Sequence, residues 1–267
     1  MLAEISPTGA QPFADLSSWA IVGVFVTYFL GFFIRGAFGF GSNMPIVLIT
    51  AWILGPHHAI LVVVLASLAA QAHLLPQGVR SADWTVAKPL LAGMLIGSVV
   101  GTWAFTVLEG DWLMFVMGLL IASIVLFDQF SIFDRLSRRI DLRSRKLAGI
   151  LSLFSGTAGA ISGGGGIYFL AVYLKIACAT PASLRGTSIV TAVVLMLVRV
   201  ILLVAVGAFN LAMVLETTLL VPMIFLGTWT GTRLFHASSP ARFYAALQIL
   251  LLCAALAITV RGLIKII

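Results

Sequence analysis

Apolar runs of membrane-spanning length follow one another along almost the whole of this chain. Crossing the hydrocarbon core of a bilayer takes about 17–25 residues of helix, and we find ten segments near that length. They cover 16–34, 38–54, 59–75, 89–108, 112–127, 147–163, 167–179, 187–207, 214–235 and 243–260. The pattern predicts an all-α polytopic membrane protein.

The composition also indicates that lipid is the main solvent of this chain. Hydrophobic residues make up 61% of the 267 residues and charged residues only 9%, whereas a soluble domain carries about 25% charged residues. This excludes a soluble enzyme, a nucleic-acid-binding protein, a secreted disulfide scaffold and a disordered chain. Cys178 and Cys253 have no metal-ligand spacing, so we expect no metal and no cofactor. We find no catalytic constellation, and we expect no enzymatic activity.

Two of the apolar segments, 38–54 and 167–179, are short and follow glycine-rich stretches. The first stretch reads RGAFGFGSN at 35–43, and the second reads SGGGG at 162–166. Short, interrupted segments are typical of half-helices or re-entrant hairpins, whose exposed backbone is tolerated only where protein or a cavity covers it. We therefore expect a glycine-interrupted short helix in each half of the chain.

The two halves of the chain share an ordered set of residues, which favours an internal duplication. The matches at an offset of 125 are Gly31 with Gly156, Gly39 with Gly164, Gly41 with Gly166 and Pro56 with Pro181. The pattern G-x-x-x-G-T-x-x-F then occurs at 97–105 and again at 227–235. We expect a tail at 1–15, a first repeat at 16–127, a linker loop at 128–146 and a second repeat at 147–267.

Charge predicts how the two repeats are oriented. The loop 128–146 holds six basic residues, Arg135, Arg138, Arg139, Arg143, Arg145 and Lys146, so it is expected to be cytoplasmic by the positive-inside rule. Five segments in each half would then make the repeats inverted, as in many secondary transporters. If each interrupted pair is one broken helix, the total falls to eight and the repeats are parallel. We favour the inverted arrangement.

Carboxylates are absent from the middle of every apolar segment, whereas an arginine lies deep within one of them. Arg199 lies deep within 187–207, while Arg35 and Arg185 adjoin the interrupted segments. A cation in lipid usually faces a cavity or a partner, and without an acid nearby in sequence a bound anion would be an attractive partner. The alternative for Arg35 and Arg185 is that they snorkel to the interface and set topology. Glu216 is expected to be interfacial, so we do not expect a carboxylate proton relay.

The glycine stretches favour a binding site for that anion. Glycine lets a backbone approach a ligand closely, and a helix that begins there presents free N–H groups and a positive dipole end. Gly39, Gly41, Ser42 and Asn43 would form one such end, and Ser162, Gly163, Gly164, Gly165 and Gly166 the other. Close helix packing is the alternative, and it is the one we favour for Gly97, Gly101, Gly227 and Gly231. Gln71 would line a pathway, and His57 and His58 are expected in an exposed loop.

These residues resemble the TauE/SafE family of sulfite exporter-like membrane permeases. The first-half signature G-x-x-G-F-G-x-x-x-x-P is similar to Gly36, Gly39, Phe40 and Gly41 with Pro45, which arrives a few positions early. The second-half signature is similar to Ser155-Gly156, Gly163 to Gly166 and Arg185-Gly-Thr. Ser42-Asn43 and the lack of a second-half proline depart from this signature. The resemblance spans about 20–260 and implies transport of sulfite, sulfonates or related oxyanions.

Together the sequence predicts a secondary transporter that moves a small sulfur-containing anion across the plasma membrane by alternating access between two repeats. Its expected partners are the anionic substrate and the lipid bilayer, with a homodimer as a possible assembly and no nucleic acid. The alternatives are an anion channel with the same pore chemistry and, ranked last, a membrane scaffold subunit that transports nothing.

Overall fold

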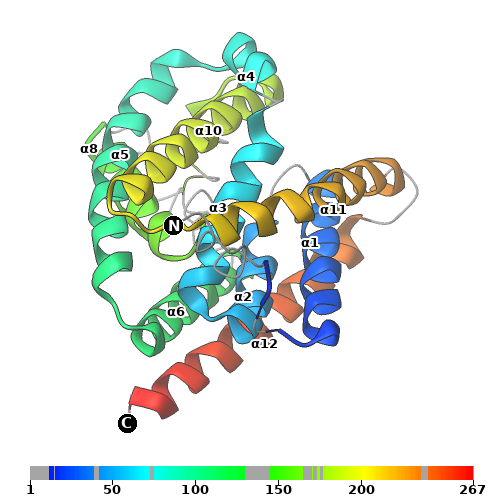
Figure 1. The fold of residues 1–267 in the computed structure, drawn as a ribbon. Helices are drawn as coiled ribbons and strands as arrows, with labels where there is room; N and C mark the ends of the chain where they lie inside the picture. Colours follow the sequence, from blue (N-terminus) through cyan, green and yellow to red (C-terminus); the bar gives the residue numbers. More distant parts are fainter. Residues whose placement is uncertain are drawn as a thin grey trace, which may run out of the picture.

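The computed structural model describes residues 12–14, 16–38, 42–72, 75–129, 145–164, 170, 173–174, 177–235 and 240–266. Over these residues the fold is helical, as the sequence predicts (Figure 1). The helices are α1 (Ser18–Phe38), α2 (Asn43–Leu54), α3 (Pro56–Ala72), α4 (Leu75–Ser81), α5 (Trp84–Val107), α6 (Gly110–Gln129), α8 (Arg145–Ile161), α10 (Pro181–Ala205), α11 (Leu211–Phe235) and α12 (Pro240–Ile266).

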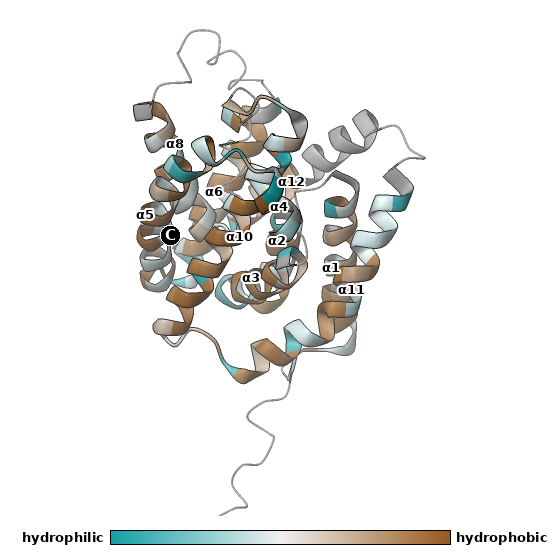
Figure 2. Ribbon diagram, turned by 90° about the horizontal axis from the view of Figure 1, so that it is seen from above, coloured by the Kyte–Doolittle hydropathy of each residue, from teal (hydrophilic) through white to brown (hydrophobic). Residues whose placement is uncertain are grey.

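Five helices within the described residues are long and apolar enough to cross a membrane. These stretches are Ser18–Gly36, Trp84–Val107, Gly110–Phe127, Ala182–Ala205 and Leu211–Arg233. Large apolar side chains also point outward, for example Trp103 on α5 and Ile201 on α10, each about two-thirds exposed. Figure 2 shows hydrophobic residues along most of the helices. Lipid, rather than water, satisfies such a surface, so this is an integral multi-pass membrane protein.

Glycines allow two pairs of helices to pack closely while running parallel. On α5, a Cβ at Gly97 would overlap the Leu153 carbonyl oxygen of α8, and one at Gly101 would contact Ala160. On α11, Gly227 lies against Phe29 of α1 in the same manner. Small residues let helix backbones approach in this way. Helix packing, which the sequence favoured for these glycines, is therefore confirmed for Gly97, Gly101 and Gly227.

A third pair, α6 and α12, is antiparallel, and it helps to define the two ends of the molecule. Lys265 Nζ near the end of α12 lies 3.4 Å from Asp111 Oδ1 at the start of α6. We call this end, with Phe13 and the start of α11, the terminal face. The opposite end, where α6 ends and α8 begins beside the 130–144 stretch, is the linker face. The starts of α5 and α10 and the ends of α1 and α11 also lie at the linker face.

Several expected boundaries are corrected by the structure. The third segment begins at Pro56 rather than 59, so His57 and His58 lie in the first turn of α3 and not in an exposed loop. Proline suits the first helical position because it needs no N–H partner. α4 was not predicted, because a seven-residue helix has too short an apolar pattern to recognise. The expected segment 167–179 lies largely outside the described residues.

We predict that the α5–α8 contact depends on glycine at position 97. Gly97→Ala should lower the free energy of unfolding by about 1–3 kcal/mol, because the added methyl group overpacks the interface. Gly149→Ala is the matched control, since no atom lies within 4 Å of its added Cβ. Alanine there should be neutral or stabilising by up to about 1 kcal/mol. Melting temperatures in detergent measure both, and equal values for the two variants would contradict the packing role.

Candidate functional site

α2 begins near the middle of the molecule rather than at one of its faces. Gly55, with φ +80°, closes the turn between α2 and α3, and the two helices pack as an antiparallel hairpin. The twelve residues of α2 rise about 18 Å from that turn, against a hydrocarbon core of about 30 Å. The N-terminus of α2 therefore lies well inside the span of the long helices.

Asn43, the first residue of α2, joins the two glycine-rich stretches. Its Nδ2 donates to the carbonyl oxygen of Gly163 at 2.8 Å, across 120 residues of sequence. Its Oδ1 accepts hydrogen bonds from Ser42 Oγ at 2.9 Å and from Ser67 Oγ on α3 at 2.8 Å. The structure thus brings Ser42, Asn43, Gly163 and Gly164 together, with Ser67 as a residue that the sequence did not single out. We call this group the Asn43 cluster.

The start of α2 has the features of an anion-binding helix end. Ser42 makes no side-chain cap, because its hydroxyl donates to Asn43 instead. Pro45 has no N–H, and the amides of Asn43 and Met44 have no hydrogen-bond partner among the described residues. Unpaired N–H groups and the positive end of a helix dipole attract negative charge.

Gly163 and Gly164 carry the chain away from the end of α8 in conformations that favour glycine. Their φ angles are +80° and +122°, and the Gly164 N–H donates to Gly159 O at 2.8 Å. A Cβ at Gly164 would overlap the side-chain amide of Asn43. Ser162 is buried and donates to Ala158 O. Gly39, Gly41, Gly165 and Gly166 lie outside the described residues, and so does the second helix end expected there.

Arg199 is fully buried, and its guanidinium binds the end of a helix. The guanidinium donates to Gly159 O at 3.2 Å and to Ala160 O, both in the last turn of α8. It also lies 5.7 Å from the centroid of the Phe105 ring. The last carbonyls of a helix lack intrahelical donors and form the negative end of its dipole. Sequence reasoning looked for acids near in sequence and so missed this distant helix end, and an anion near Arg199 stays a prediction.

Arg199 is nevertheless an incompletely compensated positive charge. Within the part of the chain that the structure describes, its Nε has no hydrogen-bond partner, and neither of the two ion pairs found there involves it. Carbonyl dipoles offset about half a charge at a helix end. The interior next to the Asn43 cluster is therefore electropositive.

The other expected site residues are not members of the Asn43 cluster. Arg185 is exposed in the second turn of α10, about 21 Å before Arg199 along the helix axis. Arg35 is half-buried in the last turn of α1, with its guanidinium 5.9 Å from the centroid of the Phe32 ring. Both therefore lie toward the linker face. Gln71 is buried on α3, one turn beyond Ser67.

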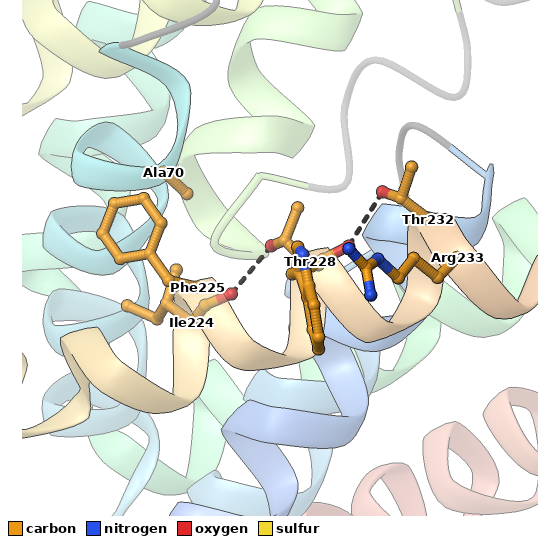
Figure 3. A pocket seen from close by; sticks show the side chains of 7 residues that line it. Ala70, Ile224, Phe225, Thr228, Thr232 and Arg233 are labelled. Atoms are coloured by element: carbon orange, nitrogen blue, oxygen red, sulfur yellow. Dashed lines mark hydrogen bonds between the residues drawn. The ribbon is translucent and has the colours of Figure 1, made fainter.

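A cavity of about 340 Å³ opens beside the linker-face half of α11 (Figure 3). It is lined by Ala70, Ile224, Phe225, Thr228, Trp229, Thr232 and Arg233. Thr232 Oγ1 donates to Thr228 O at 2.8 Å, and the Arg233 guanidinium lies 4.0 Å from the centroid of the Trp229 ring. Ala70 is one helical turn from Ser67, so the cavity approaches the Asn43 cluster. Sequence reasoning missed these residues, although threonines four apart in an apolar helix were a signal.

Comparison with known proteins gives one match. The family model described as "Sulfite exporter TauE/SafE" matches residues 24–258, which is nearly the whole chain. No curated protein and no solved structure matches it. The match includes both glycine-rich stretches and every residue of the Asn43 cluster.

We predict that Gly164→Ala disrupts the Asn43 cluster more than backbone strain alone would. The matched control is Gly207→Ala, because Gly207 also has a positive φ, +68°, but no atom within 4 Å of its added Cβ. Each alanine should cost about 1–3 kcal/mol in backbone strain, and Gly164→Ala should cost more because the methyl group displaces Asn43. Melting temperatures measure the difference. A smaller loss for Gly164→Ala than for Gly207→Ala would contradict this account of the cluster.

Proposed function

The chain belongs to the sulfite exporter TauE/SafE family, and from that premise we propose that it is a secondary transporter of a small sulfur-containing oxyanion. The class includes sulfite and sulfonates such as sulfoacetate, moved across the plasma membrane. The observation that carries the proposal is the Asn43–Gly163 contact, which joins two broken helical regions beside an open helix end.

The donors around Asn43 suit a tetrahedral or pyramidal oxyanion. The backbone amides of Asn43 and Met44 provide small, neutral donors at the positive end of α2, and the hydroxyls of Ser42 and Ser67 hold the Asn43 side chain in place by donating to its Oδ1. Gly163 and Gly164 leave room for the ligand because they have no side chains. Arg199 supplies a positive field without a direct contact, since its guanidinium is held by the end of α8. Neutral donors in direct contact, with a positive charge at a greater distance, attract an anion but do not hold it as an ion pair, so the anion can also be released.

The anion would approach from the linker face through the cavity beside α11. Arg35, Arg185 and Arg233 lie at or near this face, and fields of one sign steer ions of the other. The six basic residues of 128–146 make this face cytoplasmic by the positive-inside rule. In this proposal Arg35 and Arg185 attract the anion on its way in, and Gln71 borders the route between the cavity and the Asn43 cluster.

We further propose that the two halves form inverted repeats that alternate access around the site. The packing is reciprocal, since α1 of the first half runs parallel to α11 of the second and α8 of the second runs parallel to α5 of the first. The last helices, α6 and α12, are antiparallel to one another. This is the exchange that a two-fold axis in the membrane plane would produce, and transporters with such repeats bind substrate near the midplane.

Transport by purified protein in liposomes tests the proposal, with Asn43→Asp as the decisive variant. Wild-type protein should take up sulfite or sulfoacetate saturably, and anion loaded inside should accelerate uptake. Asn43→Asp keeps the shape of the side chain but places a negative charge beside the anion, so uptake should fall at least about tenfold, which corresponds to about 1.4 kcal/mol. Unchanged uptake by a folded Asn43→Asp protein would remove the cluster from the site.

Asn210→Asp is the matched control for this variant. Asn210 caps the start of α11 through a hydrogen bond from Met213 N to its Oδ1 at 2.9 Å, and aspartate caps a helix equally well. This variant should transport like wild type. Ser42→Ala, a gentler change, should weaken uptake if Asn43→Asp fails to fold. Large conductance without saturation or counterflow would indicate a channel instead of a carrier.

A further inference from the structure

A buried carboxylate at the terminal face has one ionisable partner. Glu216 lies in the second turn of α11 and is 3% exposed. Its Oε1 accepts a hydrogen bond from Phe13 N at 3.0 Å, and its Oε2 lies 2.5 Å from His58 Nε2 at the start of α3. A charged carboxylate cannot stay buried without a proton or a counter-charge. The structure adds to the expectation of an interfacial Glu216 that its carboxylate is buried and paired.

Most of the other charged and titratable groups around the pair have a partner of their own. On α3, His57 Nε2 lies 3.1 Å from the backbone oxygen of Phe105 on α5. The Arg199 guanidinium of α10 lies over the side-chain ring of Phe105. On α1, the Tyr28 phenol is buried within electrostatic range of Glu216. The remaining groups of the terminal face are Glu109, Asp111 held by Lys265, and Arg261 stacked on Trp52 of α2. Within the described residues, His58 alone forms an ion pair with Glu216.

The pair can exchange protons with water. The His58 side chain is 28% exposed, whereas that of Glu216 is 4% exposed. Imidazole is the side chain whose charge changes between about pH 5 and 8. A proton from water at the terminal face can therefore bind the imidazole and convert the hydrogen bond into an imidazolium–carboxylate pair.

The pair also joins the two helices that carry the proposed substrate route. On α3, His58 is nine residues before Ser67 of the Asn43 cluster, about 14 Å along the axis. On α11, Glu216 is twelve residues before Thr228 in the cavity wall, about 18 Å along the axis. Phe13 N donates to the same carboxylate, and the Phe13 ring packs on Phe25 of α1. Separation of His58 from Glu216 would free α11 and α1 to move relative to α3.

We propose that His58 and Glu216 form a proton-binding site that closes the terminal face of the transporter. With a proton on the imidazole, the positive His58 and the negative Glu216 hold α3 and α11 together, and Phe13 stays bonded to the carboxylate. When the proton returns to water at that face, the buried carboxylate loses its counter-charge, water must reach it, and the helices separate. The anion function rests on the proposal above, but proton binding by this pair does not.

Hydrogen exchange at the Phe13 amide tests the site without any substrate. After correction for the intrinsic rate, protection of this amide in the wild-type protein should be about tenfold greater at pH 5.5 than at pH 8.5. His58→Gln and Glu216→Gln should each remove the pH dependence, and either variant decides the matter if the other does not fold. His57→Gln is the matched control, because the His57 ring contacts the backbone carbonyl of Phe105 and not Glu216. This variant should retain the wild-type pH dependence.

Transport then separates this inference from the proposed function. Exchange of anion across liposomes should slow at acidic pH in the wild-type protein, and this pH dependence should be absent in His58→Gln. If the wild-type protein moves no sulfur oxyanion, the proposed function fails, while amide exchange still decides whether the pair binds the proton. A response to pH at Phe13 that survives in both His58→Gln and Glu216→Gln would overturn the inference.

Discussion

Backbone polar groups inside a membrane must find partners within the protein, and this requirement governs the centre of the fold. Two helices are interrupted there, and lipid offers no hydrogen bonds to the freed groups. Asn43 bonds the Gly163 carbonyl while two serine hydroxyls bond its own oxygen. Arg199 supplies donors to the end of α8. The Asn43–Gly163 hydrogen bond links the two interruptions across the halves of the chain, so the proposed anion site would lie at the junction between them.

Local patterns in the sequence predicted the parts of the fold that depend on local chemistry. Apolar runs predicted the membrane spans, because each span must present apolar side chains to lipid whatever the rest of the chain does. Glycine spacing predicted the close packing of Gly97 and Gly227, since only a residue without Cβ fits there. The partners of Arg199 and Glu216 were not predictable in the same way. They lie 40 and 158 residues away, and no periodicity encodes which distant helix end will meet a given side chain.

Two basic residues near the end of α12 lie at the terminal face, although the positive-inside rule places most basic residues on the side of the linker. Arg261 and Lys265 are basic residues at the end opposite the basic linker. The structure places Arg261 over Trp52 and Lys265 beside Asp111. Each cation therefore has a partner on a neighbouring helix, which reduces its weight as a topological signal. The apparent exception agrees with antiparallel packing of α6 and α12.

The reciprocal pairing of α1 with α11 and of α5 with α8 has a consequence for biosynthesis. During translation, α1 enters the membrane long before its packing partner has been made, since residues 39–210 lie between the two helices. Its glycine-bearing surface must therefore remain in contact with lipid or with the insertion machinery until the C-terminal half emerges. α5, by contrast, meets α8 as soon as the linker has passed. The α5–α8 contact can thus form before the α1–α11 contact, and α1 is among the last helices to gain its packing partner.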